Sequence, residues 1–159
     1  MTVSRFLRIG IAGYGVVGKR RRHYIDLHPR LQVVAVCDQR LENSRGGEGG
    51  CNTYSNYLDL LNDDLDALFV CLSNDVAAEV TIAGLNIGLH VFCEKPPGRN
   101  VDEVLEVKCV LENRSAQVLK YGFNHRYHES VKSALSMIES KKLGEIVNIR
   151  GIYGKSDIV

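Results

Sequence analysis

The stretch that most constrains the fold of this chain is 6–38. It opens with an apolar run, Phe6–Ala12, of the kind that a buried strand needs, and a turn with three glycines in the order G-x-G-x-x-G follows. A helix-compatible stretch comes next, and a second apolar run, Val33–Cys37, ends at the carboxylate of Asp38. This order of strand, glycine turn, helix and second strand predicts a βαβ unit. The three glycines are Gly13, Gly15 and Gly18.

Each glycine has a separate physical role in such a unit. Gly13 permits the tight turn out of the strand, Gly15 lets the backbone approach a pyrophosphate, and Gly18 lets the helix pack closely on the strand. The free N–H groups and the dipole at the start of the helix then face the phosphates. Asp38 lies 20 positions after Gly18, where an acceptor for a ribose hydroxyl pair is expected. The stretch therefore predicts a dinucleotide site, and the alternative is a βαβ unit whose glycines only tighten a turn.

The residues next to these positions belong to the same predicted site. We expect the cofactor to be NAD, because the carboxylate of Asp38 should repel a 2′-phosphate. NADP is not excluded, since Arg40 lies two positions further on and could accommodate that phosphate. The neighbouring residues expected to contact the cofactor are Tyr14, Val16, Val17, Gln39 and Arg40.

Length and composition exclude several classes of protein. The 159 residues suffice for one domain and at most a part of a second, and 45% hydrophobic residues indicate a real core. A net charge of +1 predicts neither a nucleic-acid partner nor a membrane partner. The five cysteines form no C-x-x-C pair, which favours reduced thiols, a cytoplasmic location and no metal site. We expect the basic cluster Lys19–His23 to be a solvated helix face, with phosphate binding as the alternative.

Strand and helix signals alternate along the chain, which predicts an α/β fold with a doubly wound, Rossmann-type parallel sheet. The pattern changes after Gly144, where Ile146–Tyr153 alternates apolar and polar residues as a half-solvated strand does. We interpret this segment as the first strand of a second α/β domain. The expected division is a dinucleotide-binding domain over residues 1–123, and a linker helix with that first strand over residues 124–159. The strands and helices expected between the two ends are Thr53–Tyr54, Tyr57–Leu61, Asp66–Leu72, Val76–Asn86, Leu89–Cys93, Val101–Asn113, Gln117–Tyr121 and His128–Lys141.

A second motif, Glu94-Lys95-Pro96, directly follows the apolar run that ends at Cys93. Open α/β sheets bind ligands at the carboxyl ends of their strands, which is where this motif should lie. An amine that is partly desolvated there can exchange a proton with a substrate hydroxyl. The alternative for Lys95 is an ordinary surface lysine beside a turn.

The two motifs together resemble those of the Gfo/Idh/MocA family of nicotinamide-dependent oxidoreductases. The resemblance runs along the whole chain and includes the stretch Gly122–Arg126. It implies an enzyme that transfers a hydride between NAD(P) and a carbon that bears a hydroxyl group, usually in a sugar, a sugar derivative or a cyclitol. The partners that we expect are this small-molecule substrate and further copies of the chain in a homo-oligomer.

The resemblance also implies roles for residues outside the glycine turn. Ser73 and Asn74 would lie along the cofactor, and Glu94 would face its nicotinamide side. Lys95 would contact the substrate hydroxyl as the catalytic and substrate-binding residue. Asn124 and Arg126 would line the substrate pocket.

Two departures from the family pattern matter for these expectations. The stretch Ser73–Ala78 lacks the proline and the histidine that many members have after this strand. No Asp-x-x-x-His element of a second domain follows, so the chain resembles the cofactor-binding half of such an enzyme and should be inactive alone. A non-catalytic NAD(H)-binding module or subunit is the alternative function. An enzyme that uses a nucleotide sugar or S-adenosylmethionine is disfavoured by the motif at 94–96.

Overall fold

A computed structural model describes residues 5–47, 50–152 and 154 of the chain. The chain folds into two compact units, and the boundary lies between Gly122 and Phe123. The first unit contains the sheet and the glycine turn, and the second contains two short helical elements.

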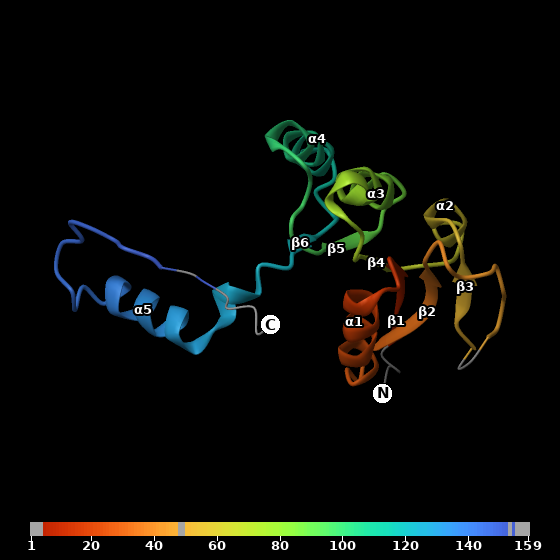
Figure 1. The fold of residues 1–159 in the computed structure, drawn as a ribbon, viewed down its shortest axis with the longest axis horizontal. Coiled ribbons are helices and arrows are strands. Elements are labelled where there is room, and N and C mark those ends of the chain that lie inside the picture. Colours follow the sequence, from red (N-terminus) through yellow and green to blue (C-terminus); the bar gives the residue numbers. More distant parts are fainter. Residues whose placement is uncertain (1–4, 48–49, 153, 155–159) are drawn as a thin grey trace. The chain divides into compact units, whose positions relative to one another are not determined.

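The first unit is built on one six-stranded sheet with the strand order β3-β2-β1-β4-β5-β6 (Figure 1). All neighbouring strands pair in parallel, and the order reverses between β1 and β4. This arrangement confirms the predicted doubly wound, Rossmann-type fold. The elements are β1 Leu7–Ala12, α1 Val16–Asp26, β2 Leu31–Cys37, β3 Asn52–Tyr54, α2 Tyr57–Leu60, β4 Ala67–Val70, α3 Asn74–Asn86, β5 His90–Cys93, α4 Val101–Glu112 and β6 Leu119–Tyr121.

The two faces of the sheet are covered by different helices. Helix α1 lies on one face, and helices α3 and α4 lie on the other (Figure 1). Side chains alternate along a strand, so Ile9 and Ile11 of β1 join the core beneath α1 with its Ile25. Leu68 belongs to the opposite core, where a Cβ on Gly84 of α3 would lie only 2.9 Å from its side chain. The sheet is thus buried on both sides, as its continuous apolar strands predict.

The strands end level with one another at the carboxyl end of the sheet. The pairing register places the last residues of all six strands side by side in one row. The residue that follows each strand therefore emerges at the same end of the sheet. In spatial order, the row is Tyr54, Cys37, Ala12, Val70, Cys93 and Tyr121.

The outer strand β3 is covered by the segment that precedes it. Ser44 and Thr53 exchange both of their backbone hydrogen bonds, at N–O distances of 2.9 and 2.8 Å, in an antiparallel bridge. The amide oxygen of Asn43 accepts a hydrogen bond from the backbone N–H of Ser55 at 2.8 Å. The segment that leads from β2 to β3 is therefore attached to the sheet over its described part.

The second unit contains a short 3₁₀ helix, Asn124–Tyr127, and the helix α5, Glu129–Glu139. The helix agrees with the expected one, whereas the 3₁₀ turn was not expected. The strand expected over Ile146–Tyr153 is not formed in 146–152, and Tyr153 lies outside the described residues. An extended segment becomes a strand only when its backbone groups pair with a neighbour, and these described residues pair with none.

No helix in the described ranges is long and apolar enough to cross a membrane.

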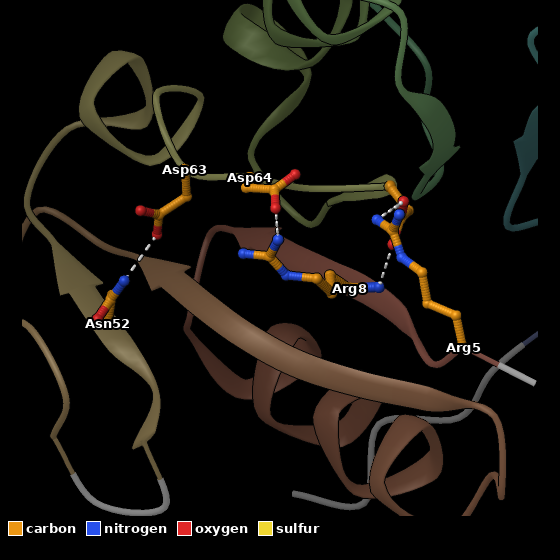
Figure 2. Close-up of polar contacts among 6 residues, drawn as sticks. Arg5, Arg8, Asn52, Asp63 and Asp64 are labelled. Carbon is orange, nitrogen blue, oxygen red and sulfur yellow. Dashed lines mark hydrogen bonds and ion pairs between the residues drawn. The ribbon is translucent and has the colours of Figure 1, made fainter. Parts of the chain in front are cut away.

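The amino ends of β1 and β4 are joined by polar contacts (Figure 2). Asp66 accepts hydrogen bonds from the backbone N–H of Arg8 and from the guanidinium of Arg5, both at 2.8 Å. Its own backbone N–H donates to the carbonyl of Arg8, also at 2.8 Å. Asp64 forms an ion pair with the Arg8 guanidinium, but its side chain is 76% exposed. Asp66 is therefore the residue that attaches the loop before β4 to the start of β1.

We predict that Asp66→Ala lowers the free energy of unfolding by about 1–3 kcal/mol, because it leaves the N–H of Arg8 without its acceptor. The matched control is Asp64→Ala, which should cost less than about 1 kcal/mol because it removes only an exposed ion pair. Urea denaturation followed by circular dichroism measures both values. Equal losses for the two variants would contradict the role assigned to Asp66.

Candidate functional site: the carboxyl end of the sheet

Backbone hydrogen bonds extend the sheet by one residue beyond its carboxyl end. In five places, the residue after a strand donates its N–H to the last carbonyl of the neighbouring strand. The segments that leave the sheet therefore start from fixed positions, which is what a preorganised ligand site requires. The five bonds are Gly13 to Cys37 at 2.8 Å, Asp38 to Tyr54 at 3.0 Å, Cys71 to Ala12 at 2.7 Å, Glu94 to Val70 at 2.8 Å and Gly122 to Cys93 at 2.9 Å.

Two of the three motif glycines are required by the packing of the turn. Gly13 has φ of +92°, and a Cβ there would lie 2.5 Å from the carbonyl oxygen of Cys71. A Cβ on Gly18 would lie 2.0 Å from the carbonyl oxygen of Gly13. These contacts are the tight turn and the close helix–strand approach that the motif predicts.

Gly15 differs from the other two glycines. Its φ of −79° suits any residue, and a Cβ there would have one neighbour within 4 Å, the Nη2 atom of Arg40 at 3.8 Å. Packing within the described chain therefore gives no reason for a glycine at this position. A ligand that approaches the backbone closely gives one, and the position fits a pyrophosphate at the start of α1.

A cleft of about 380 Å³ opens beside the glycine turn. Its lining unites residues from the ends of β1, β2 and β4, which the sequence separates widely. The expected cofactor residues among them are Gly13, Gly15, Asp38, Gln39, Arg40 and Ser73, and the others are Cys71, Leu72, Asp75 and Val76. The expected contacts Tyr14, Val16, Val17, Gly18 and Asn74 flank this lining in the chain.

Asp38 and Arg40 form a two-point ion pair within the cleft. Arg40 donates from Nε to Oδ1 at 2.7 Å and from Nη2 to Oδ2 at 3.0 Å. The Arg40 guanidinium holds the pKa of Asp38 below its usual range, and the backbone N–H groups of Arg40 and Tyr14 act in the same direction. Asp38 is therefore a carboxylate across the neutral pH range, which suits an acceptor for two ribose hydroxyls.

A second cavity, of about 490 Å³, shares Asp38 and three further lining residues with the first cleft. Its lining adds Cys37 at the end of β2 and three residues that follow β3, namely Ser55, Asn56 and Tyr57. The Tyr57 hydroxyl donates to Glu79, which raises the pKa of the tyrosine to about 12. Sequence reasoning missed these three residues, because their role depends on β3 and α2 lying beside β2.

Glu94 is held by a residue of the first helix. Arg21 forms an ion pair with the Glu94 carboxylate, and its guanidinium lies over the Phe92 ring, 5.2 Å from the centroid. Within the basic cluster, Arg21 and Arg22 are half-buried and the other residues are exposed. The expectation of a solvated face was therefore wrong for these two arginines, because Arg21 reaches the end of β5 and Arg22 pairs with Asp26 and contacts the Tyr14 hydroxyl.

Lys95 follows Glu94 at the same end of the sheet and is exposed, and its peptide bond to Pro96 is cis. No ion pair or side-chain hydrogen bond engages its amine anywhere in the described ranges. Asn124 and Arg126 are exposed residues of the 3₁₀ helix in the second unit. Their expected place beside a substrate stays a prediction.

Comparisons with known proteins identify the family to which this chain belongs. Residues 7–123 match a family described as an oxidoreductase family with an NAD-binding Rossmann fold. Inositol 2-dehydrogenase of Salmonella typhimurium is 28% identical in an alignment of 159 positions, gaps included, that covers 96% of this chain and 47% of that protein. D-glucoside 3-dehydrogenase of Escherichia coli is 32% identical over 145 residues, which cover 88% of this chain and 41% of that protein.

A solved structure gives the same result. The crystal structure of myo-inositol 2-dehydrogenase from Lactobacillus plantarum has a TM-score of 0.77 and 32% identity, and the match covers 90% of this chain and 44% of that one. The chain thus spans about half the length of the relatives that it matches. It belongs to the Gfo/Idh/MocA oxidoreductase family, and residues 7–123 are the NAD-binding Rossmann domain of that family.

Proposed function

We propose that this chain is the cofactor-binding half of an NAD-dependent dehydrogenase that acts on a hydroxyl group of a sugar, a sugar derivative or a cyclitol. One observation carries the proposal: the glycine turn, Asp38 and Lys95 follow three strands whose ends are level with one another. A dinucleotide site and an amine suited to proton transfer are thus on the same end of one sheet. The relatives named above, which act on inositol or a glucoside, support the substrate class.

Each residue has a specific task in this proposal. The N–H groups at the start of α1 bind the pyrophosphate, and Gly15 leaves room for it. Asp38 accepts hydrogen bonds from the adenosine ribose, and the cavity at Tyr57 receives the adenine. NAD bound in this way would supply the hydride acceptor or donor of the reaction. Lys95 holds the substrate hydroxyl and exchanges a proton with it.

The partners and the setting are part of the same proposal. Asn124 and Arg126 contribute to the substrate pocket, and the chain works in a homo-oligomer. The five cysteines are free thiols, which supports a cytoplasmic location.

Replacement of Gly15 separates binding from folding. We predict that Gly15→Ala lowers the affinity for NAD at least about tenfold, because the added Cβ meets the pyrophosphate. It should cost no more than about 2 kcal/mol of stability, the scale of an unfavourable N-cap residue. Gly18→Ala is the control, because its Cβ clashes with the carbonyl of Gly13 and should impair folding itself. Calorimetric titration and thermal unfolding measure the two effects, and full NAD affinity in Gly15→Ala would show that the glycine serves only the turn.

The choice of cofactor depends on Asp38 and Arg40. We predict that the parent chain binds NAD more tightly than NADP, and that Asp38→Ala weakens NAD binding roughly 10- to 100-fold through the loss of charge-assisted hydrogen bonds to the ribose. Arg40→Ala should weaken NADP binding more than NAD binding, because it removes the cation nearest to a 2′-phosphate. Arg45→Ala, which alters an exposed arginine of the same loop, should change neither. Tighter binding of NADP by the parent chain would contradict the prediction.

The role of Lys95 requires a longer protein in which these 159 residues are followed by a substrate domain. There, Lys95→Ala should lower kcat/KM by roughly two orders of magnitude, the scale of general acid–base catalysis, while NAD affinity stays unchanged. The 159-residue chain alone should bind NAD without turning substrate over. Activity within a few-fold of the parent in Lys95→Ala, or substrate-dependent NADH formation by the short chain, would each disprove its part of the prediction.

A further inference from the structure

The ion pair between Arg21 and Glu94 connects the two motifs of the chain. Arg21 lies on α1, three positions after the last motif glycine, and Glu94 is the first residue after β5, 73 positions along the chain. The two side chains are only 28% and 11% exposed. Removing one partner of an ion pair that is largely buried destabilises the protein, because the other charge is left buried without a partner.

The surroundings of the pair keep the Glu94 carboxylate in one place. The Arg21 guanidinium lies over Phe92, and Phe92 stacks on Phe69 with 4.9 Å between the ring centroids. On the other side, a Cβ on Gly122 would lie 2.7 Å from the Oε2 atom of Glu94. The carboxylate thus lies between a guanidinium and a backbone segment that approaches closely, and its charge cannot move away from the end of β5.

The position of this charge matters if the chain binds a dinucleotide as proposed above. A doubly wound sheet binds one nucleotide over each half, and Asp38 marks the adenosine half at the end of β2. Glu94 ends a strand of the other half, which therefore receives the nicotinamide nucleotide. The oxidised nicotinamide ring carries a positive charge, and the reduced ring is neutral. A fixed carboxylate in this half favours the oxidised form, and a guanidinium paired with it cancels that preference.

We propose that Arg21, by neutralising Glu94, sets the relative affinity of the site for the oxidised and reduced forms of the cofactor. The proposal rests on the proposed function, since it requires NAD to bind in this cleft. It assigns Arg21 a tuning role exerted through Glu94, without contact to the substrate.

The test measures the dissociation constants of the 159-residue chain for NAD⁺ and NADH, by calorimetry and by nucleotide fluorescence. The quantity of interest is the ratio of the NADH constant to the NAD⁺ constant. Arg21→Met leaves the carboxylate unpaired and should raise this ratio roughly three- to tenfold, the scale of one unit charge acting through partly solvated protein. Glu94→Gln leaves the guanidinium unpaired and should lower the ratio by a similar factor. The double variant should return it to within about twofold of the parent.

The controls separate this role from a purely structural one. Arg20→Met removes the same charge from an exposed position of the same helix and should leave the ratio unchanged. Arg21→Lys keeps the charge and should stay near the parent ratio. A structural defect would weaken the binding of both forms of the cofactor alike and leave the ratio of the two constants unchanged. An unchanged ratio in Arg21→Met and Glu94→Gln would therefore overturn the proposal. Shifts of the ratio in the same direction in both variants would also overturn it.

Three further outcomes are decisive. If circular dichroism shows that Arg21→Met does not fold, the proposal is judged on Glu94→Gln, whose ratio should shift, and on Arg21→Lys, whose ratio should not. These two variants are suitable because both keep a polar side chain at each of the two positions. If the parent chain binds neither form of the cofactor, the proposed function fails and this proposal fails with it. If the parent binds both forms and the ratio is the same in every variant, only this proposal fails.

Discussion

The level carboxyl end of the sheet is the constraint on which the rest of the site depends. Six strands stop in one row, and backbone hydrogen bonds continue the row by one further residue at five positions. A shift of one residue in any pairing would turn the following side chain to the other face. Because the register holds, Gly13, Asp38 and Glu94 start from a common line although they are far apart in the sequence. The candidate functional residues are thus placed by the backbone of the sheet and not by flexible loops.

Charge at this end of the sheet is arranged in pairs. Asp38 is matched by Arg40 from the same turn, and Glu94 is matched by Arg21 from a different element. The two pairs differ in exposure, because the Arg40 side chain is 75% exposed and that of Arg21 is 28% exposed. An exposed guanidinium can leave its partner at little cost, whereas a half-buried one cannot. The Asp38 carboxylate can therefore exchange its partner for another, whereas the Glu94 carboxylate is held in place.

Local patterns were sufficient to predict most of the fold. The alternation of apolar runs with helical stretches predicted the parallel sheet, and the spacing of the glycines predicted the turn at the start of α1. The N-cap of α4 is also a local feature, since Asn100 accepts a hydrogen bond from the N–H of Glu103, three positions further on, at 3.0 Å. Each of these features is determined by residues close together in the chain, which is why reading the sequence in short windows finds them.

The features that were missed depend on contacts between distant segments. Nothing in the pattern of α1 indicates which of its four consecutive basic residues, Lys19 to Arg22, will meet an acid 73 positions away. The cavity lined by Tyr57 arises only when α2 lies beside β2. In 146–152 the alternating pattern predicted a strand that is not formed. Such a pattern forms a strand only when a partner strand is present. Local sequence patterns thus predict helices, strands and turns, whereas contacts between these elements can be identified only in the folded structure.

The bridge between Ser44 and Thr53 has a consequence for how the protein behaves at high concentration. The outer strand of an open sheet presents unpaired N–H and C=O groups, and such strands are templates for sheet growth between molecules. Here, the segment before β3 occupies those groups at Thr53, and β3 itself has only three residues. At the opposite side, β6 is equally short. Each outer strand therefore offers few free backbone groups with which another molecule could pair. The short and partly covered outer strands thus protect this sheet against fibrillar association.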